Sequence, residues 1–134
     1  MPSFRFSEVA KLLGVSDDTV RRWVDAGTLA AGTDSVGRKI VDGAELAAFA
    51  RSGATEVPDP SSVQRSARNR FVGLVTEVVA DKVMAQVELQ CGPHRVVSLM
   101  STEAVRELGL EPGVLAVAVI KATQVVVEIP NGQR

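Results

Sequence analysis

The sequence is poor in aromatic residues and nearly lacks cysteine. The first scarcity limits how a core can be built, and the second excludes one class of protein. Aromatic residues make up 4% of the 134 positions, so any core has to be built from Val, Ala and Leu. The single cysteine, Cys91, cannot form a disulfide within the chain, which excludes a disulfide scaffold. No apolar run approaches the roughly 18 residues that a spanning helix needs, and the first residues lack a signal-peptide pattern. We therefore expect a cytoplasmic protein without a membrane partner.

Positive charge is not in excess either, which bears on any contact with nucleic acid. The formal net charge is −1, and residues 1–60 carry seven Lys and Arg against nine Asp and Glu, a net charge of −2. This balance excludes a protein that binds nucleic acid through bulk charge. Any DNA contact has to depend on the local placement of charge. A single copy should bind weakly, so pairing of copies would matter.

The composition is sufficient for two small domains joined by a linker. The chain is 46% apolar, which is ordinary for a globular protein. Residues 53–62 have no hydrophobic periodicity and contain two prolines, as is typical of a semi-extended spacer. We predict a first domain over 1–52, a linker over 53–65 and a second domain over 66–134.

The predicted first domain carries the start signals of three helices. Ser7 and Ser16 are placed to cap two short helices joined by a tight turn, the geometry of a helix-turn-helix. The second of these helices has an apolar face that begins at Val20 and continues three and four residues on. Residues 29–41 read as two short strands around a Gly-containing tip, and Asp42 is placed to cap the third helix.

This segment resembles the winged helix-turn-helix of MerR and excisionase proteins. The stretches that match are residues 7–15, 19–23, 27–29 and 37–39. The resemblance implies that the second helix enters the DNA major groove through Thr19, Arg21 and Arg22, and that Arg38 and Lys39 of the wing contact phosphates. The long dimerising helix of MerR regulators does not follow, so dimerisation has to come from elsewhere. A module that docks another protein is the alternative, because the segment is acidic overall.

The predicted second domain contains five stretches that read as strands, of which residues 83–90 alternate apolar and polar residues. The five stretches are residues 72–79, 83–90, 95–100, 114–120 and 124–129. One short helix, capped by Ser101 or Thr102 and ended by Gly109, is expected between the third and fourth of them. Five strands and one helix are consistent with a small OB-like barrel. The predicted fold class is therefore α+β in two domains, and the long apolar runs near the end suggest a surface buried against another copy.

Residues 66–70, Ser-Ala-Arg-Asn-Arg, have donors suited to an oxyanion where the first of these strands begins. Arg68 offers a planar fork of donors that is always charged, and Ser66 adds a hydroxyl. The stretch resembles the opening of the molbindin (Mop) domain, a small barrel that binds molybdate or tungstate. The resemblance continues, in the family's order, through residues 97–110, 111–113 and 119–123.

The resemblance to molbindin implies a molybdate or tungstate oxyanion held between the subunits of a dimer or hexamer. Such a dianion needs donors and positive charge but no acceptors. The ligand residues that it implies are Ser66, Arg68, Ser101, Lys121 and, through its backbone, Ala122. Two positions depart from the family pattern. Ala104 replaces a frequent Ser and removes a donor, whereas Arg70 replaces a frequent Gln and either adds a charge or faces solvent.

No pattern in the sequence indicates catalysis. Cys91 and His94 are three residues apart, but two ligands on a hairpin turn without a second pair make a weak metal site. The glycine-rich phosphate loop and the common hydrolase motifs are missing. We predict a protein that is not an enzyme and that has no direct ligands for a metal cation.

These patterns leave three hypotheses. The first is a transcriptional regulator that binds DNA and senses molybdate or tungstate through an oligomeric barrel. The second is an oxyanion-binding or storage oligomer whose N-terminal domain docks another protein. The third is a DNA-binding protein whose barrel serves only in assembly or binds another ligand.

Overall fold

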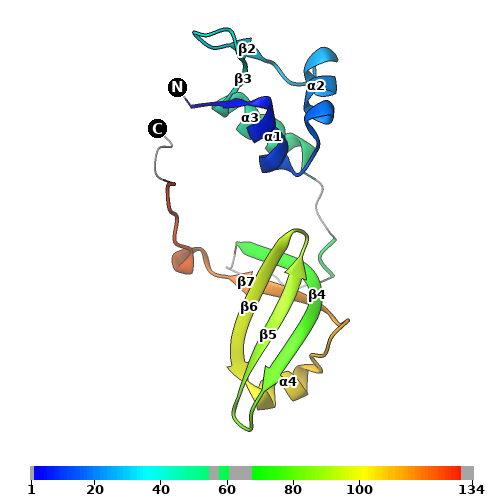
Figure 1. Cartoon of the computed structure of the whole chain (residues 1–134). Coiled ribbons are helices and arrows are strands. Elements are labelled where there is room, and N and C mark those ends of the chain that lie inside the picture. The colour runs from blue at the N-terminus through cyan, green and yellow to red at the C-terminus, as the bar shows by residue number, and fades with distance from the viewer. Residues whose placement is uncertain (1, 55–57, 61–67, 131–134) are drawn as a thin grey trace. The chain divides into compact units, whose positions relative to one another are not determined.

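The computed structural model describes residues 2–54, 58–60 and 68–130 of the chain. The chain forms two compact units, one containing the residues up to Glu56 and the other spanning Val57–Val127. Each unit has a sheet and a hydrophobic core of its own (Figure 1). None of the helices in the described ranges is long and apolar enough to cross a membrane.

The first unit is a winged helix-turn-helix. Helices α1 (Phe6–Leu13) and α2 (Asp17–Asp25) are joined by a tight turn at Gly14, whose φ of 69° is a left-handed conformation that glycine adopts without strain. A third helix, α3 (Gly43–Gly53), follows the wing. The antiparallel sheet contains, in spatial order, β1 (Ser3–Arg5), β3 (Lys39–Asp42) and β2 (Gly32–Thr33). The hairpin of β2 and β3 is the wing that the sequence predicts.

Helices α2 and α3 begin where the sequence predicts them. Ser16 Oγ accepts the Thr19 N–H of α2 at 3.2 Å. Asp42 Oδ2 accepts the Glu45 N–H of α3, also at 3.2 Å. Each side chain satisfies one of the backbone donors that a helix leaves unpaired at its start, which is why Ser and Asp are favoured there.

Helix α1 begins earlier than the sequence predicts. Ser7 was expected to cap it, but Ser7 lies inside the helix, which starts at Phe6. The Arg5 N–H donates to Glu8 Oε1 at 2.9 Å, so the glutamate closes the first turn around Arg5 instead. The prediction of a Ser7 cap was therefore wrong, because strand β1 leads directly into the helix and the cap lies at Arg5, two residues before Ser7.

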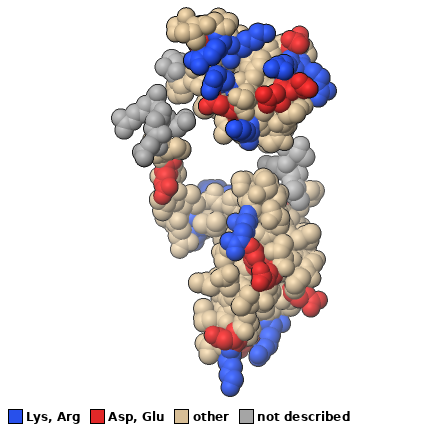
Figure 2. All heavy atoms as spheres, viewed as in Figure 1, with Lys and Arg blue, Asp and Glu red and all other residues tan. Residues whose placement is uncertain are grey.

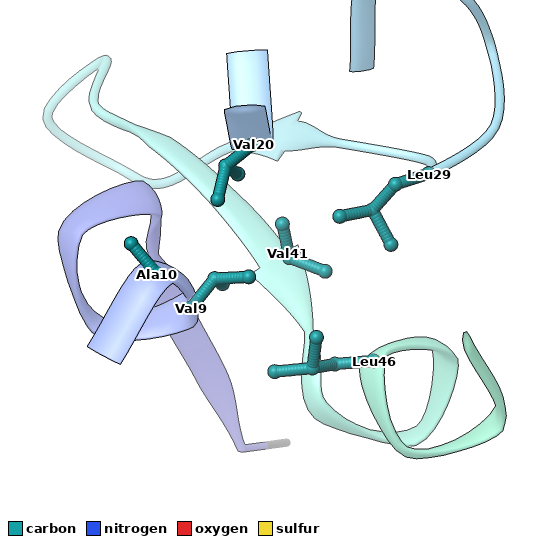
Figure 3. Packing of buried hydrophobic residues seen from close by; sticks show 6 residues of the cluster. All are labelled: Val9, Ala10, Val20, Leu29, Val41 and Leu46. Carbon is teal, nitrogen blue, oxygen red and sulfur yellow. The ribbon is translucent and has the colours of Figure 1, made fainter. Parts of the chain in front are cut away.

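The core of the first unit is small and aliphatic. Its buried residues are Val9, Ala10, Val20, Leu29, Val41 and Leu46 (Figure 3). Trp23 packs at the margin against Phe49, with ring centroids 4.9 Å apart. This packing fixes the orientation of α2, because Val20 and Trp23 on its inner face hold its opposite face toward solvent.

The second unit is a curled antiparallel sheet with one short α-helix, an OB-like half-barrel where the sequence predicts a small OB-like barrel. Its four strands have the order β6-β5-β4-β7. Helix α4 (Thr102–Leu108) follows β6, and the 3₁₀ helix η1 (Ala122–Gln124) follows β7. The strands, in chain order, are β4 (Asn69–Ala80), β5 (Met84–Cys91), β6 (His94–Ser101) and β7 (Leu115–Ile120).

Strand β4 pairs with a neighbouring strand on each of its two sides. Its residues 69–74 pair with β7, and residues 74–80 pair with β5, with an irregularity between Val75 and Glu77. Gly73 lies in this strand, and a Cβ at its position would be 2.3 Å from the Gln90 carbonyl oxygen and 2.7 Å from Cys91 Sγ. A glycine is therefore required here, because the neighbouring strand approaches too closely for any side chain.

The fifth strand expected at residues 124–129 is not formed. The chain turns through η1 after β7, and residues 125–129 have no strand assignment. Val126, Val127 and Ile129 are 83%, 85% and 74% exposed. The prediction of a fifth strand was wrong for the single chain, because a stretch of high β-propensity forms a strand only when a sheet edge pairs with it.

Candidate functional site

The outer face of α2 presents two of its predicted residues as one cluster. Arg22 Nη2 donates to Thr19 Oγ1 at 3.0 Å, and that hydroxyl also lies 3.0 Å from Ser16 Oγ at the helix cap. Thr19 is half-buried, whereas Arg22 is exposed. The cap therefore orients Thr19, and Thr19 in turn orients the Arg22 guanidinium.

Arg21 lies apart from that cluster. Its Nη1 is 3.5 Å from Asp18 Oδ1, and both side chains are well exposed. An ion pair of this length and exposure is weak, because water competes for both partners. Arg21 can therefore exchange its carboxylate partner for another anion at little cost in free energy.

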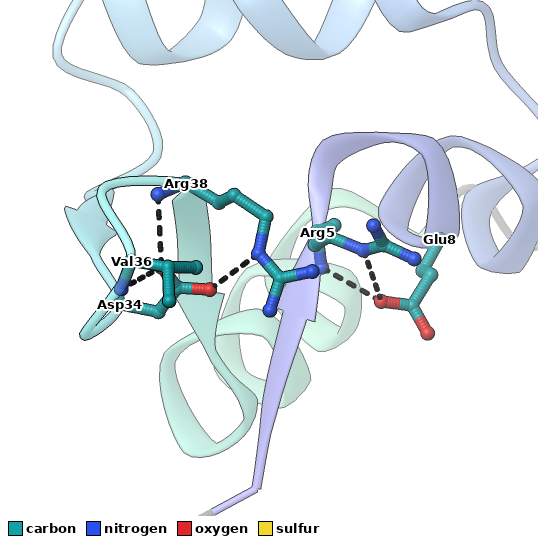
Figure 4. A network of polar contacts seen from close by, with 5 residues as sticks. All are labelled: Arg5, Glu8, Asp34, Val36 and Arg38. Carbon is teal, nitrogen blue, oxygen red and sulfur yellow. Dashed lines mark hydrogen bonds and ion pairs between the residues drawn. The ribbon is translucent and has the colours of Figure 1, made fainter.

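The wing is organised around Asp34 (Figure 4). Asp34 Oδ1 accepts the Val36 and Arg38 N–H groups at 3.0 and 2.8 Å, and Oδ2 is 2.8 Å from Arg38 Nε. These contacts, the Arg38 N–H first among them, hold the pKa of the Asp34 carboxyl below its ordinary value. The carboxylate thus positions Arg38 at the wing tip while engaging Nε of its guanidinium.

Arg5 is a basic residue of this surface that the sequence analysis missed. In the register of β1 and β3, Arg5 is opposite Ile40, two residues from Arg38. Figure 4 draws Arg5 and Arg38, each with its own carboxylate partner. Lys39 is exposed on the same hairpin. Nothing in the local sequence indicates Arg5, because its position depends on pairing between residues 3–5 and 40–42.

Acidic side chains are interspersed with these cations. Figure 2 shows Asp and Glu between the Lys and Arg side chains of the first unit rather than one continuous basic patch. Arg5 Nε is 3.8 Å from Glu8 Oε1, in addition to the Arg21 and Arg38 pairs. Affinity for a polyanion through this surface would therefore be modest for one copy.

In the second unit, the structure brings three of the predicted oxyanion residues to one end of the sheet. Arg68 directly precedes β4, and Lys121 and Ala122 directly follow β7. Asn69 pairs with Ile120, and its Nδ2 donates to the Ile120 carbonyl at 3.1 Å, so Arg68 and Lys121 flank the same end. The predicted ligand Ser66 lies outside the described residues.

Ser101 lies at the opposite end of this sheet. It pairs with Met84, and the neighbouring Ala85 pairs with Ala80 at the far end of β4 from Asn69. Strand β4 has 12 residues, which at about 3.3 Å per residue is roughly 40 Å of strand. Figure 1 shows α4, which Ser101 caps, and η1 at opposite ends of the sheet. One chain therefore does not bring Ser101 to Lys121.

The environment of Ser101 is suited to donation. Its Oγ accepts the Ala104 N–H at 3.1 Å, which confirms Ser101 as the cap of α4 and leaves its O–H to donate elsewhere. Ala104 supplies no hydroxyl of its own. The adjacent Thr102 is buried, and its Oγ1 donates to the Asp81 carbonyl at 2.9 Å, so it anchors the helix.

Arg70 neither faces solvent nor adds a free charge. Its Nε is 2.7 Å from Asp59 Oδ2, and its side chain is 22% exposed. Its Nη1 is buried without a hydrogen-bond partner in the described part of the chain. The solvent-facing reading of Arg70 was therefore wrong, and its charge is paired with the Asp59 carboxylate.

Cys91 and His94 flank the β5–β6 turn. Cys91 is buried, and burial raises the pKa of its thiol, whereas His94 is exposed. A raised pKa disfavours the thiolate, which is the form that attacks or ligates. The described ranges contain no cluster of three or more His, Cys, Asp or Glu residues arranged to hold a metal ion.

Comparison with known proteins assigns a family to each unit. A TOBE domain model matches residues 65–127, and a helix-turn-helix domain model matches residues 4–54. The probable molybdenum-pterin-binding protein of Haemophilus influenzae is 43% identical over 65 residues, which are 48% of this chain and 94% of that protein. Molybdenum-pterin-binding protein 3 of Clostridium pasteurianum is 38% identical over 63 residues, 46% of this chain and 93% of that protein. The chain belongs to the TOBE-domain family.

A solved structure agrees with this TOBE assignment. The cytoplasmic molybdate-binding protein ModG, solved with molybdate bound, is 41% identical with a TM-score of 0.50 over 54% of this chain and 52% of its own. The N-terminal unit is a helix-turn-helix domain. A helix-turn-helix and a TOBE domain together make a binding protein rather than an enzyme.

Proposed function

We propose that this TOBE protein is a cytoplasmic DNA-binding transcriptional regulator that senses molybdate or tungstate. The observation that carries the proposal is the fusion of a helix-turn-helix domain to a TOBE domain whose relatives are named for molybdenum-pterin or molybdate binding. Neither domain alone makes a sensor. Together they supply one surface for a nucleic acid and one for a small oxyanion.

The proposed DNA surface is of the MerR and excisionase type. Helix α2 enters the major groove with Thr19, Arg21 and Arg22, and the wing contacts phosphates with Arg38 and Lys39. Two observations support this assignment: the inner face of α2 packs on the core, and Asp34 holds Arg38 at the wing tip. Arg5 is added to the phosphate contacts because β1 pairs it with Ile40 of the wing strand β3.

The proposed oxyanion site is shared between two copies. Arg68, Lys121 and the Ala122 N–H come from one copy, and the Ser101 hydroxyl comes from another. The supporting observation is their separation to opposite ends of a single sheet. The Ala122 N–H opens η1, where the first backbone donors have no partner within the helix. Ser66 is the remaining proposed ligand.

A shared site links oxyanion binding to assembly. A ligand that contacts two copies stabilises the assembled state, so its binding free energy shifts the association equilibrium. Paired helix-turn-helix domains bind DNA more tightly than single ones through their effective concentration. This linkage is how an oxyanion would alter DNA occupancy without touching DNA.

Calorimetric titration of molybdate into the full chain tests the proposal, with sulfate as the control for anions of equal charge and Lys121→Ala as the matched variant. We expect binding tighter than micromolar for molybdate, little heat from sulfate, and a loss of at least tenfold in affinity on removing Lys121. Lys82→Ala removes an exposed lysine at the β4–β5 turn and should bind as the unaltered chain does. Equal affinity in the Lys121 and Lys82 variants would exclude the proposed site.

Two alternatives rest on specific observations. The internal ion pairs of Arg21 and Arg38 favour an oxyanion-binding or storage oligomer whose N-terminal unit docks a protein. The alanine at position 104 favours a DNA-binding protein whose barrel only assembles or binds another ligand. Retention of the protein on a DNA column distinguishes the regulator from the first alternative. The heat of molybdate binding distinguishes the regulator from the second alternative.

A further inference from the structure

Arg70 lies on the same face of the second sheet as the proposed oxyanion ligands Arg68 and Lys121. The side chain of Phe71 packs against the core, so alternation along the chain places Arg68 and Arg70 on the opposite face. Arg70 pairs with Val119 in the register of β4 and β7, and Lys121 lies two residues beyond Val119. The backbone of Lys121 is still extended, with a φ of −62° and a ψ of 140°. Lys121 therefore shares this face.

The spacing of these three cations suits one small anion. Diagonal neighbours on one face of an antiparallel pair lie about 7–8 Å apart, which long side chains can span. Arg70 and Lys121 are such neighbours, and Arg68 is two residues from Arg70 along the chain. Like charges at this separation repel one another, and an anion placed among them relieves the repulsion. The face therefore favours a bound anion.

Asp59 supplies an anion from within the same chain. Its Oδ2 accepts a hydrogen bond from Arg70 Nε at 2.7 Å, and both side chains are less than a third exposed. The guanidinium has a donor that this contact leaves unused, since Arg70 Nη1 is buried without a hydrogen-bond partner in the residues that the structure describes. A tetrahedral dianion carries more charge and more acceptor oxygens than one carboxylate. An oxyanion is therefore a stronger acceptor for Arg70 than Asp59 is.

We propose that Arg70 is a further binding residue of the oxyanion site, and that the Asp59 carboxylate occupies its guanidinium until an oxyanion replaces it. This inference rests on the proposed function, because it concerns the same site. The protein then competes with its own ligand. Its apparent affinity for the oxyanion is lowered in proportion to the fraction of molecules in which Arg70 is free. Asp59 thereby sets the oxyanion concentration at which the site fills.

Calorimetric titration of molybdate into the full chain tests the inference with two substitutions that should have opposite effects. Arg70→Gln should weaken binding roughly tenfold or more, because a charged donor to the dianion is lost. Asp59→Asn should tighten binding about fivefold, because the competing carboxylate is removed while the shape of the side chain is kept. Glu77→Gln is the matched control, since it removes one negative charge seven residues along the same strand and should leave the affinity unchanged.

A double variant shows whether Asp59 acts through Arg70. Asp59→Asn combined with Arg70→Gln should match Arg70→Gln alone within about twofold, because no guanidinium remains for the carboxylate to occupy. A carboxylate that merely repelled molybdate would instead weaken binding whether or not Arg70 is present. Tightening by Asp59→Asn in both backgrounds therefore overturns the inference. Weaker binding by the Asp59 variant than by the unaltered chain overturns it as well.

Thermal unfolding provides a second measurement. Without molybdate, Asp59→Asn should lower the unfolding temperature, but at saturating molybdate the variant and the unaltered chain should unfold together, because the ligand has already broken the pair. A purely structural pair would keep the difference in both conditions. If the Arg70 and Asp59 variants bind molybdate as the unaltered chain does, this inference fails while the proposed function stands. If neither the unaltered chain nor the Asp59 variant binds molybdate, both fail.

Discussion

Arg70 Nε lies 2.7 Å from Asp59 Oδ2, and this ion pair ties the segment before the barrel to the first residues of β4. Both side chains are less than a third exposed, which distinguishes the pair from the exposed Arg21–Asp18 contact at 3.5 Å. A partly buried, well-aligned guanidinium–carboxylate pair contributes more to stability than an exposed one.

Asp59→Asn should therefore destabilise the second unit by about 1 kcal/mol, because the Arg70 guanidinium loses its charged acceptor. Urea unfolding monitored by circular dichroism measures the loss. Asp18→Asn is the matched control, and its exposed pair should cost less than about 0.5 kcal/mol. Equal losses in the two variants would show that the Asp59 contact has no special role.

Gly73→Ala should destabilise the second unit by about 2 kcal/mol or more, because the added Cβ would lie 2.3 Å from the Gln90 carbonyl oxygen and force the strands apart. Gly32→Ala is the control, since a Cβ there meets no atom within 4 Å and the backbone needs no positive φ. Thermal unfolding of both variants provides the comparison. A Gly73 variant as stable as the Gly32 variant contradicts the close approach of β4 and β5.

The Asp34 carboxyl should make the wing sensitive to acid. Its pKa is lowered below the ordinary value of 3.8 in the folded protein, so its contribution to stability is present above that value and is lost as the pH falls through the folded pKa. Thermal unfolding between pH 7 and pH 2 should show this loss. The Asp34→Asn variant should be less stable than the unaltered chain at pH 7 and should lose less stability on acidification. Parallel curves of unfolding temperature against pH for the two proteins would show that the Asp34 carboxyl does not cause the acid sensitivity.

The proposed oxyanion site predicts complementation between two inactive variants. Ser101→Ala and Lys121→Ala should each lose at least tenfold in molybdate affinity, since a donor to a dianion is removed. In a mixed assembly, Ser101 of the Lys121 variant meets Lys121 of the Ser101 variant, so a fraction of the sites is intact. Calorimetry on the unfolded and co-refolded mixture should recover tight binding at reduced stoichiometry. No recovery would mean that both residues act within one chain.

The proposed DNA surface predicts a graded loss of retention on a DNA column. Arg22→Ala, Arg38→Ala and Arg5→Ala should each weaken binding, and for the two wing-side residues the slope of log affinity against log salt should fall by about 1 for each phosphate contact removed. Arg51→Ala, on the last turn of α3, is the control with the same charge change. Unchanged retention in all variants would favour the protein-docking alternative.

Local signals in the sequence were sufficient for much of this protein. Ser16, Asp42 and Ser101 cap helices because each places an oxygen within reach of a backbone N–H three residues on, and no distant contact is needed. The alternation of residues 72–100 predicts three strands for the same reason: period 2 places one face on the core. The two family matches also depend on motifs that are continuous in the chain.

Tertiary structure decided what local signals could not. Arg5 joins the wing, and α1 starts at Phe6, because β1 pairs with β3 across more than thirty residues. Arg70 is paired because Asp59, eleven positions earlier in the chain, lies within reach of its guanidinium. Ser101 and Lys121 lie at opposite ends of the sheet because of the strand register, and residues 125–129 remain unpaired because no edge of their own sheet receives them. A residue's local conformation follows from its neighbours in sequence, but its partner follows from which backbone edges and charges the folded chain brings within reach.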